Sequence, residues 1–243
     1  MRVVAIIQAR MGSTRLPGKV LKGLSGETVL ARVVNRSRRA ALVDEVVVAT
    51  TVRDADDAIV KECERLAVEY FRGDEADVLD RYYRTAREFS ADAIVRITSD
   101  CPLVDPELID AAIHSFLGQM PDYATNALVV TYPRGLDVEV FTAEALARSW
   151  NSAKETYQRT HVTPYFYENP ELFKILSLTA ENDYSRYRWT LDTTEDLEAI
   201  REIYKHFPDG HRIHWREVIS LMENHPDLAE KNAHVLQKAL REG

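Results

Sequence analysis

The chain has 243 residues, of which 45% are hydrophobic and 29% charged, which is enough to bury a sizeable core and excludes a disordered or fibrous protein. Its 31 lysines and arginines against 39 aspartates and glutamates give a net charge of -8, which provides no positive field to attract nucleic acid. Cys63 and Cys101 lack the spacing of a disulfide framework or a zinc site.

The first predicted element is a strand over residues 3–9. Its apolar run from Val3 to Ile7 is too short for the apolar region of a secretory signal and is followed by arginines. Because the low cysteine content also suits a reducing compartment, we expect a cytoplasmic protein with no membrane association.

Strands and amphipathic helices then alternate along the chain. Runs of β-branched residues predict strands at 45–50, 68–71, 93–97 and 123–126, while apolar residues at helical spacing predict helices at 28–40, 55–67, 77–89 and 106–117. This alternation is typical of βαβ units. We therefore expect an α/β fold with a mostly parallel sheet covered by helices.

The pattern changes after about Pro133. Strand-like segments follow at 136–141, 173–178 and 189–191, around an aromatic stretch at 165–167, and a helix is expected from Thr194. We expect one domain over 1–243, with an extension at about 131–180 and a helical tail at about 208–243. The tail is predicted to hold two helices between 215 and 241, the second carrying Val235, Leu236, Ala239 and Leu240.

A polar loop at residues 8–19 directly follows the first strand, where an α/β sheet binds its ligands. Two glycines allow the backbone to turn tightly, and Arg10, Arg15 and Lys19 provide three cations. This combination predicts a cradle for a triphosphate, although the loop matches neither the Walker A nor the dinucleotide-binding pattern. A solvated basic turn is the alternative interpretation.

Two later strand ends carry carboxylates that would face the same crevice. Asp105 stands directly before Pro106 and fits a helix cap, which leaves Asp100 as the better candidate to hold a hard divalent cation. Asp192 could be a second ligand. It precedes a helix start at which Thr193 or Thr194 is the expected cap, so the whole stretch could also be only a cap.

A family resemblance is carried by segments in a fixed order, namely 7–19, 48–50, 72–73, 79–81, 99–102, 132–139, 161–164 and 190–193. In these segments the chain resembles the cytidylyltransferase family, which couples CTP to 3-deoxy-2-ulosonic acids such as Kdo and sialic acid, and most of all the branch named after spore-coat polysaccharide biosynthesis protein F. The resemblance implies a three-layer, Rossmann-like sheet of the nucleotide-diphospho-sugar transferase type, with a small β-containing extension for dimerisation and acceptor binding.

The resemblance also implies residue roles on the nucleotide side. Asp100 and Asp192 would hold Mg²⁺ and, with Arg10 and Lys19, form the catalytic set. Arg10, Ser13 and Lys19 would grip the CTP phosphates, while the Ala9 backbone, Thr50 and Arg72 would frame the cytosine and ribose. The full nucleotide-binding set is Ala9, Arg10, Gly12, Ser13, Arg15, Lys19, Thr50, Arg72 and Asp100.

The extension is where the family places its acceptor contacts and dimer interface. Cationic and histidine side chains there could meet an acceptor carboxylate, and the two acidic ones its hydroxyls; the acceptor set is Tyr132, Arg134, Asp137, Glu139, Arg159 and His161. The alternatives are a solvated strand face for the acids and a structural role for the histidine. Thr160 stands where the branch usually has a glutamate.

The function implied is CTP-dependent activation of a sugar acid to a CMP-sugar, with release of pyrophosphate, for cell-surface glycan biosynthesis. The expected partners are CTP, Mg²⁺, a small-molecule acceptor and a second copy of the chain. The alternatives are a glycosyltransferase that uses a nucleotide-sugar, a nucleotidyltransferase that acts on a sugar phosphate or phosphonate, and a non-catalytic nucleotide-binding module.

Overall fold

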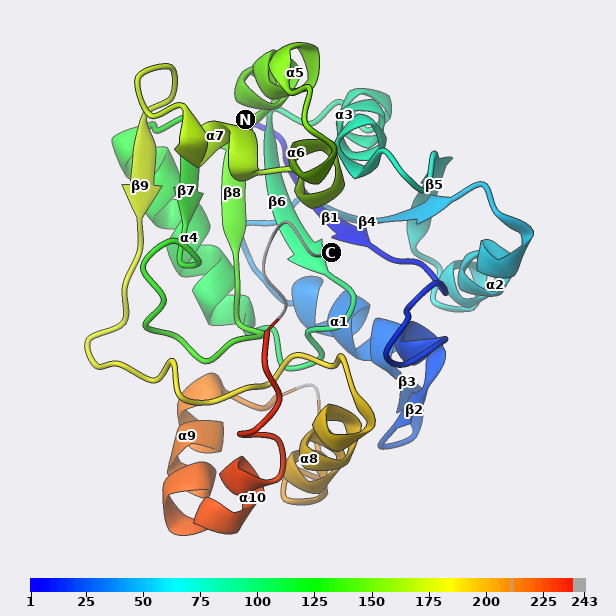
Figure 1. Cartoon of the computed structure of the whole chain (residues 1–243), viewed down its shortest axis with the longest axis vertical. Coiled ribbons are helices and arrows are strands. Elements are labelled where there is room, and N and C mark those ends of the chain that lie inside the picture. The colour runs from blue at the N-terminus through cyan, green and yellow to red at the C-terminus, as the bar shows by residue number, and fades with distance from the viewer. Residues whose placement is uncertain (211, 238–243) are drawn as a thin grey trace.

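The computed structural model describes residues 1–210 and 212–237, and within them seven strands form one central sheet (Figure 1). Neighbouring strands are parallel except where β8 pairs with β6 and with β7. The expected mostly parallel sheet is confirmed. In sheet order the strands are β5 (Glu69–Gly73), β4 (Glu45–Thr51), β1 (Val3–Gln8), β6 (Ala93–Thr98), β8 (Glu139–Thr142), β7 (Tyr123–Thr125) and β9 (Ile175–Ser177).

Two hydrophobic cores cover the two faces of the sheet, because successive side chains of a strand point to opposite faces. In β1, Val3, Ala5 and Ile7 join one core, while Val4 and Ile6 join the other. All five are almost completely buried. This burial on both faces explains why the strand is a continuous apolar run rather than an alternating one.

Helices complete the two outer layers. Apolar residues of α1 (Val29–Ser37), α2 (Asp57–Arg65) and α4 (Pro106–Gln119) enter the first core. Those of α3 (Val78–Glu88), α5 (Ala143–Ser152) and α7 (Pro164–Glu168) enter the second. The short helix α6 (Thr156–His161) packs beside α3. The molecule is therefore a three-layer sandwich of helices, sheet and helices.

The predicted helix caps are found where the sequence placed them. Asp105 Oδ1 accepts hydrogen bonds from the backbone N–H groups of Glu107 and Leu108, and Pro106 opens α4. Thr193 accepts a hydrogen bond from the N–H of Asp196 and caps α8 (Thr194–Lys205) in a capping box. The capping role of Asp105 leaves Asp100 available for another task.

A third hydrophobic cluster lies at one end of the molecule, where α8 packs with α9 (Trp215–Asn224) and α10 (Pro226–Glu230) (Figure 1). The prediction for α9 is confirmed, but the second tail helix was predicted C-terminal to its observed position. Pro226 starts it, and it ends at Glu230, so Val235 and Leu236 are not helical. Ala239 and Leu240 lie outside the described residues.

One further prediction of secondary structure was wrong, and several helices were not predicted. The aromatic stretch at 165–167, for which no element was predicted, is part of α7, and α5 and α6 were also missed. Residues 189–191 are not a strand, because their backbone bonds to loops: the Trp189 N–H donates to the Arg134 carbonyl and the Leu191 N–H donates to the Asp100 carbonyl. Short elements were also missed, namely η1 (Lys19–Leu21), β2 (Gly23–Leu24), β3 (Glu27–Thr28) and η2 (Asp54–Asp56).

The segment at 131–180 contributes β8 and β9 to the central sheet. Its description as an extension separate in function stays a prediction. Among the described residues, no helix is long and apolar enough to cross a bilayer.

Gly135 offers a test of how tightly this region is packed. Its φ of +105° is one that L side chains rarely adopt, and an added Cβ would lie 2.6 Å from the backbone nitrogen of Thr190. We predict that Gly135→Ala lowers the free energy of unfolding by about 3 kcal/mol, measured by urea denaturation. Gly118→Ala on α4 meets nothing within 4 Å and should raise stability by about 1 kcal/mol. Equal stability of the two variants would contradict this account.

Candidate active site

In the sheet, β1 lies between β4 and β6. Helix α1, which connects β1 to β4, and helix α3, which leads into β6, cover opposite faces of the sheet, so a crevice forms at the end of β1. A pocket of about 740 Å³ opens there. Most of the residues singled out from the sequence line it, namely Ala9, Arg10, Gly12, Ser13, Arg15, Lys19, Asp100, Arg134, Asp137, Glu139, His161 and Asp192.

The loop after β1 is held against the protein at several points. The Met11 N–H donates to Asp56 Oδ1 at 2.6 Å, and the Gly18 N–H donates to the Met11 carbonyl at 3.1 Å. Leu16 is buried. Arg10, by contrast, is half exposed and lies 3.4 Å from Glu75. These contacts fix the loop in position, and its role as a phosphate cradle stays a prediction.

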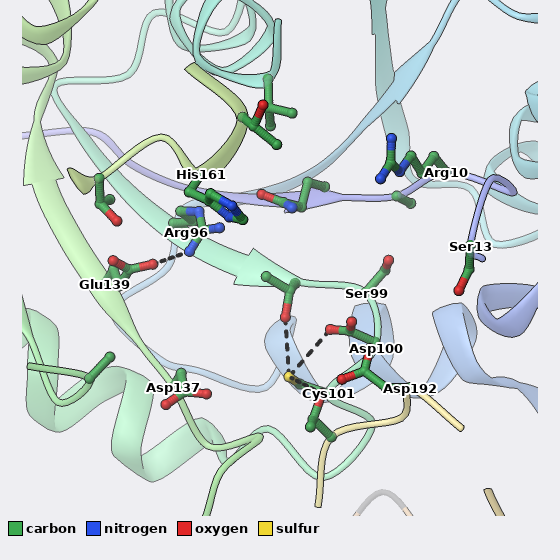
Figure 2. Close-up of a pocket in the computed structure, with 18 of the residues that line it drawn as sticks. Arg10, Ser13, Arg96, Ser99, Asp100, Cys101, Asp137, Glu139, His161 and Asp192 are labelled. Atoms are coloured by element: carbon green, nitrogen blue, oxygen red, sulfur yellow. Dashed lines mark hydrogen bonds and ion pairs between the residues drawn. The ribbon is translucent and has the colours of Figure 1, made fainter. Parts of the chain in front are cut away.

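Lys19 lies between two carboxylates from distant parts of the chain. Its Nζ donates to Asp100 Oδ2 at 2.6 Å and to Asp192 Oδ1 at 2.8 Å. Asp100 follows β6 and Asp192 precedes α8, and Figure 2 shows the two carboxylates side by side. The structure thus brings together the three charged residues that the sequence analysis selected independently.

Lys19 and Asp100 stabilise each other's charged forms. Burial disfavours the charge of Asp100, but the Lys19 ammonium outweighs burial and holds the pKa of Asp100 below its ordinary value. Burial likewise disfavours the Lys19 charge, yet the two carboxylates raise its pKa above the ordinary value. The Lys19 ammonium therefore neutralises part of the negative charge that Asp100 and Asp192 bring to this point.

A second layer of charge supports Asp192. Arg188 NH2 donates to Asp192 Oδ2 at 2.8 Å, and Arg15 NH2 lies 3.0 Å from the same oxygen. Arg188 also donates from Nε to Asp196 Oδ1 at 2.9 Å. The sequence analysis missed Arg188 and Asp196, although an arginine four residues before Asp192 and an acid four residues after it were a usable signal.

The opposite side of the pocket is built on a buried ion pair. Arg96 of β6 donates to Glu139 of β8, as Figure 2 shows, and Tyr123 donates its hydroxyl proton to Glu139 Oε1 at 2.5 Å. Glu139 is 6% exposed, so its predicted alternative, a solvated strand face, is wrong. Arg96 was not selected from the sequence, although a single cation in an apolar strand was the signal.

Asp137 adds a carboxyl group to this side. Burial raises its pKa above the ordinary value, against the opposing charge of Arg134. Thr160 and His161 line the same region of the pocket. This side therefore combines hydroxyl, imidazole and paired ionic groups. The other side is formed mainly by the cations of the loop after β1 and the carboxylates of Asp100 and Asp192.

Four predicted site residues do not line the pocket. Arg159 donates to Asp77 Oδ2 at 2.7 Å and so ties α6 to the start of α3. Tyr132 packs its ring 5.4 Å from that of Trp215. Thr50 is fully buried in β4. Arg72 donates to the Thr51 carbonyl and pairs with Asp57 at 2.7 Å. Arg159, Tyr132 and Arg72 thus have structural contacts, whereas the Thr50 hydroxyl is buried without a hydrogen-bond partner.

Cys101 lies beside the carboxylates, with its Sγ 3.6 Å from Asp100 Oδ1. Burial raises the pKa of its thiol well above the ordinary value, so the sulfur is protonated and is neither a nucleophile nor a thiolate ligand. No group of three or more His, Cys, Asp and Glu residues that could hold a metal ion occurs in the described part of the chain. Any metal at this site would rely on ligands from the substrate as well.

A mostly parallel sheet with a cation-lined loop at its switch point is the arrangement of α/β nucleotide-binding enzymes. The comparisons with known proteins narrow this class. The family described as Cytidylyltransferase matches residues 4–238. The chain is 36% identical to the spore coat polysaccharide biosynthesis protein SpsF of Bacillus subtilis, over 93% of this chain and 96% of that one.

Two further relatives agree with this match. A 3-deoxy-manno-octulosonate cytidylyltransferase of Anaeromyxobacter is 31% identical over 87% of this chain and 86% of its own. The structure of a cytidylyltransferase from Leptospira borgpetersenii superposes with a TM-score of 0.92 at 33% identity, covering 98% of this chain and 99% of that one. The chain belongs to the cytidylyltransferase family and is a nucleotidyltransferase.

The two thiols give a test of the burial found at the site. Burial raises the pKa of Cys63 to about 12 and that of Cys101 well above its ordinary value, so at pH 8 both are neutral and shielded. We predict that the native protein reacts with a disulfide reagent such as DTNB far more slowly than the unfolded protein, which titrates two thiols. Rapid labelling of a folded Cys63→Ser variant would show that Cys101 is accessible and would contradict the burial of its thiol at the site.

Proposed function

We propose that the protein transfers CMP from CTP to a sugar acid of the 3-deoxy-2-ulosonic type, releasing pyrophosphate, and that the product serves cell-surface glycan biosynthesis. Membership of the family supports the CTP reaction. Two of the relatives, one named for spore-coat polysaccharide biosynthesis and one for 3-deoxy-manno-octulosonate, support the sugar-acid class and the role in glycan biosynthesis. The proposal includes a homodimer, as the resemblance implies.

The observation that carries the proposal is the position of Lys19 between Asp100 and Asp192 at the end of the cation-lined loop. An ammonium group in this position can neutralise a phosphate while two carboxylates hold a divalent cation nearby. A binding module would have no need for two half-buried carboxylates directed at the same point. The arrangement therefore favours phosphoryl chemistry over binding alone.

The two carboxylates fit Mg²⁺. This ion prefers oxygen ligands and is commonly bound by one or two carboxylates together with substrate phosphates and waters. Asp100 and Asp192 offer the two carboxylates of that donor set, and their contacts with the Lys19 ammonium support a point that stabilises positive charge. When bound, the ion would neutralise charge that develops on the reacting phosphate oxygens.

The remaining chemistry falls to the protein's own side chains. An acceptor hydroxyl oxygen bonds to the α-phosphorus and releases its proton to solvent, while the bond to the bridging oxygen breaks and pyrophosphate leaves with that electron pair. Arg10, Arg15 and Lys19 border the space where the triphosphate would lie. Their charges would stabilise the oxygens that gain negative charge, so catalysis would depend mainly on positioning and electrostatics.

The acceptor would lie on the side formed by β8 and α6. Arg134 and His161 line this part of the pocket and could meet the acceptor carboxylate, with Asp137 as a partner for its hydroxyls. Glu139 is held by Arg96 and Tyr123, so it would present its carboxylate in a fixed orientation. Thr160, where the branch usually has a glutamate, would remove one negative charge from this surface.

Pyrophosphate release gives the first test. We predict release with CTP, Mg²⁺ and a 3-deoxy-2-ulosonic acid, and little with ATP, GTP or UTP, in a panel that also includes sugar phosphates and phosphonates. The expected product is the CMP-sugar, identified by mass. Pyrophosphate release only with a sugar phosphate or phosphonate would contradict the proposed acceptor class. Sugar transfer from a nucleotide-sugar, without pyrophosphate release, would contradict the proposed reaction.

The two carboxylates give the second test. We predict that Asp100→Asn and Asp192→Asn each lower kcat by about 10²- to 10³-fold, because each removes charge that stabilises the transition state. Circular dichroism should show that the fold is unchanged, and Asp227→Asn on an exposed turn of α10 is the matched control. A kcat near the wild-type value in either variant would assign that residue to a structural role.

Arg134 separates the acceptor side from the nucleotide side. A hydrogen bond to a charged group contributes about 1.5–3 kcal/mol, so Arg134→Ala should raise the acceptor KM about tenfold or more and leave the KM for CTP nearly unchanged. Initial rates measured against each substrate in turn check this. The exposed Arg212→Ala serves as the control, and an equal rise in both KM values would place Arg134 outside the acceptor subsite.

A further inference from the structure

The C-terminal segment 231–237 leaves α10 and returns to the site. In Figure 1 it runs from the helical group toward the sheet. Gln237 lines the pocket, and Asn232 is buried, with 3% of its surface exposed. Neither residue belongs to the segments that carry the family resemblance, and the proposed reaction assigns no role to either.

Asn232 contacts the part of the chain that carries Asp192. Its Nδ2 donates to Asp196 Oδ1 at 2.8 Å and to the Arg188 carbonyl at 3.0 Å. Asp196 Oδ2 in turn accepts the backbone N–H of Asp192 at 2.9 Å. One amide side chain therefore joins the two residues that fix the backbone and the carboxylate of Asp192.

Gln237 makes a second contact with the same group. Its Oε1 accepts a hydrogen bond from Arg188 NH1 at 2.9 Å. The remaining donors of the Arg188 guanidinium bind two carboxylates, NH2 that of Asp192 and Nε that of Asp196. Arg188 is thus held from three directions, and its hydrogen bond to Asp192 Oδ2 depends on its orientation within this set.

From these contacts we propose that Asn232 is a positioning residue for Asp192, and that the C-terminal segment 231–237 sets the divalent-metal affinity of the site. This inference rests on the proposed metal role of Asp192. The physical reason is that partners of a ligating carboxylate fix its orientation and basicity, and their loss commonly weakens metal binding by about 10- to 100-fold. Asn232 acts through Asp196 and Arg188 and has no contact with the substrate in this account.

The test measures Mn²⁺ binding to the full chain by electron paramagnetic resonance, with and without CTP. Asn232→Leu retains most of the side-chain volume but removes the donor, and it should raise the Mn²⁺ dissociation constant about tenfold. Gln237→Ala, at an exposed position, should raise it about two- to threefold without any effect on folding. The neighbouring exposed Lys231→Ala should leave it unchanged.

Kinetics provide a readout that general destabilisation would not give. In Asn232→Leu the Mg²⁺ concentration for half-maximal activity should rise by the same factor, while kcat at saturating Mg²⁺ stays within about twofold of wild type. A lowered kcat at all Mg²⁺ concentrations, with unchanged Mn²⁺ binding, would overturn the positioning role. If Asn232→Leu fails to fold, unchanged Mn²⁺ affinity in Gln237→Ala would contradict the role of the C-terminal segment in metal binding.

Asp192→Asn separates this inference from the proposed function. If Mn²⁺ binding requires Asp192 but is the same in wild type, Asn232→Leu and Gln237→Ala, only the positioning role fails. If Mn²⁺ binding is the same in wild type and Asp192→Asn, the metal role of Asp192 fails and the inference fails with it.

Discussion

The site depends on one arrangement of charges, the Lys19 ammonium between the carboxylates of Asp100 and Asp192. The three residues come from the loop after β1, the end of β6 and the approach to α8, so the arrangement forms only when the sheet, the loop and the C-terminal helices are all in place. Two carboxylates held this close together would repel each other without a cation between them. Lys19 therefore holds the site together before any ligand arrives, and the same charges are available to phosphate and metal.

The sequence predicted the central part of the fold because its strands are buried on both faces. Continuous apolar runs such as Val3–Ile7 end in polar residues at the carboxyl edge of the sheet, and the end of a parallel strand is where a ligand binds. This is why the loop with Lys19 and the carboxylate of Asp100, which follow β1 and β6, could be selected without knowledge of the fold. Asp192 was selected by its position before a helix and by the family resemblance, since residues 189–191 do not form a strand. The meeting of the three residues in one place could not be derived from local pattern, since 173 positions separate Lys19 from Asp192.

The failures of prediction have physical causes that differ from place to place. Arg159 was assigned to the acceptor because arginine suits a carboxylate, but a partner at Asp77, 82 positions away, occupies its guanidinium. Residues 189–191 have the composition of a strand, yet they bond to loops at Arg134 and Asp100. Asn232 contacts Asp196 and the Arg188 carbonyl across 36 and 44 positions of the chain, and such contacts depend on tertiary structure alone.

The reversed direction of β8 has a consequence for how such an enzyme can change its specificity. Because β8 runs against its neighbours, its first residue, Glu139, lies next to Arg96 near the carboxyl end of β6. The side proposed for the acceptor is therefore built by a segment that enters the sheet, whereas the side proposed for the nucleotide is built mainly by segments that leave it. Replacement of the stretch leading into β8 could alter which acceptor is accepted while the loop after β1 stays as it is, so the two substrate preferences are free to diverge independently in evolution.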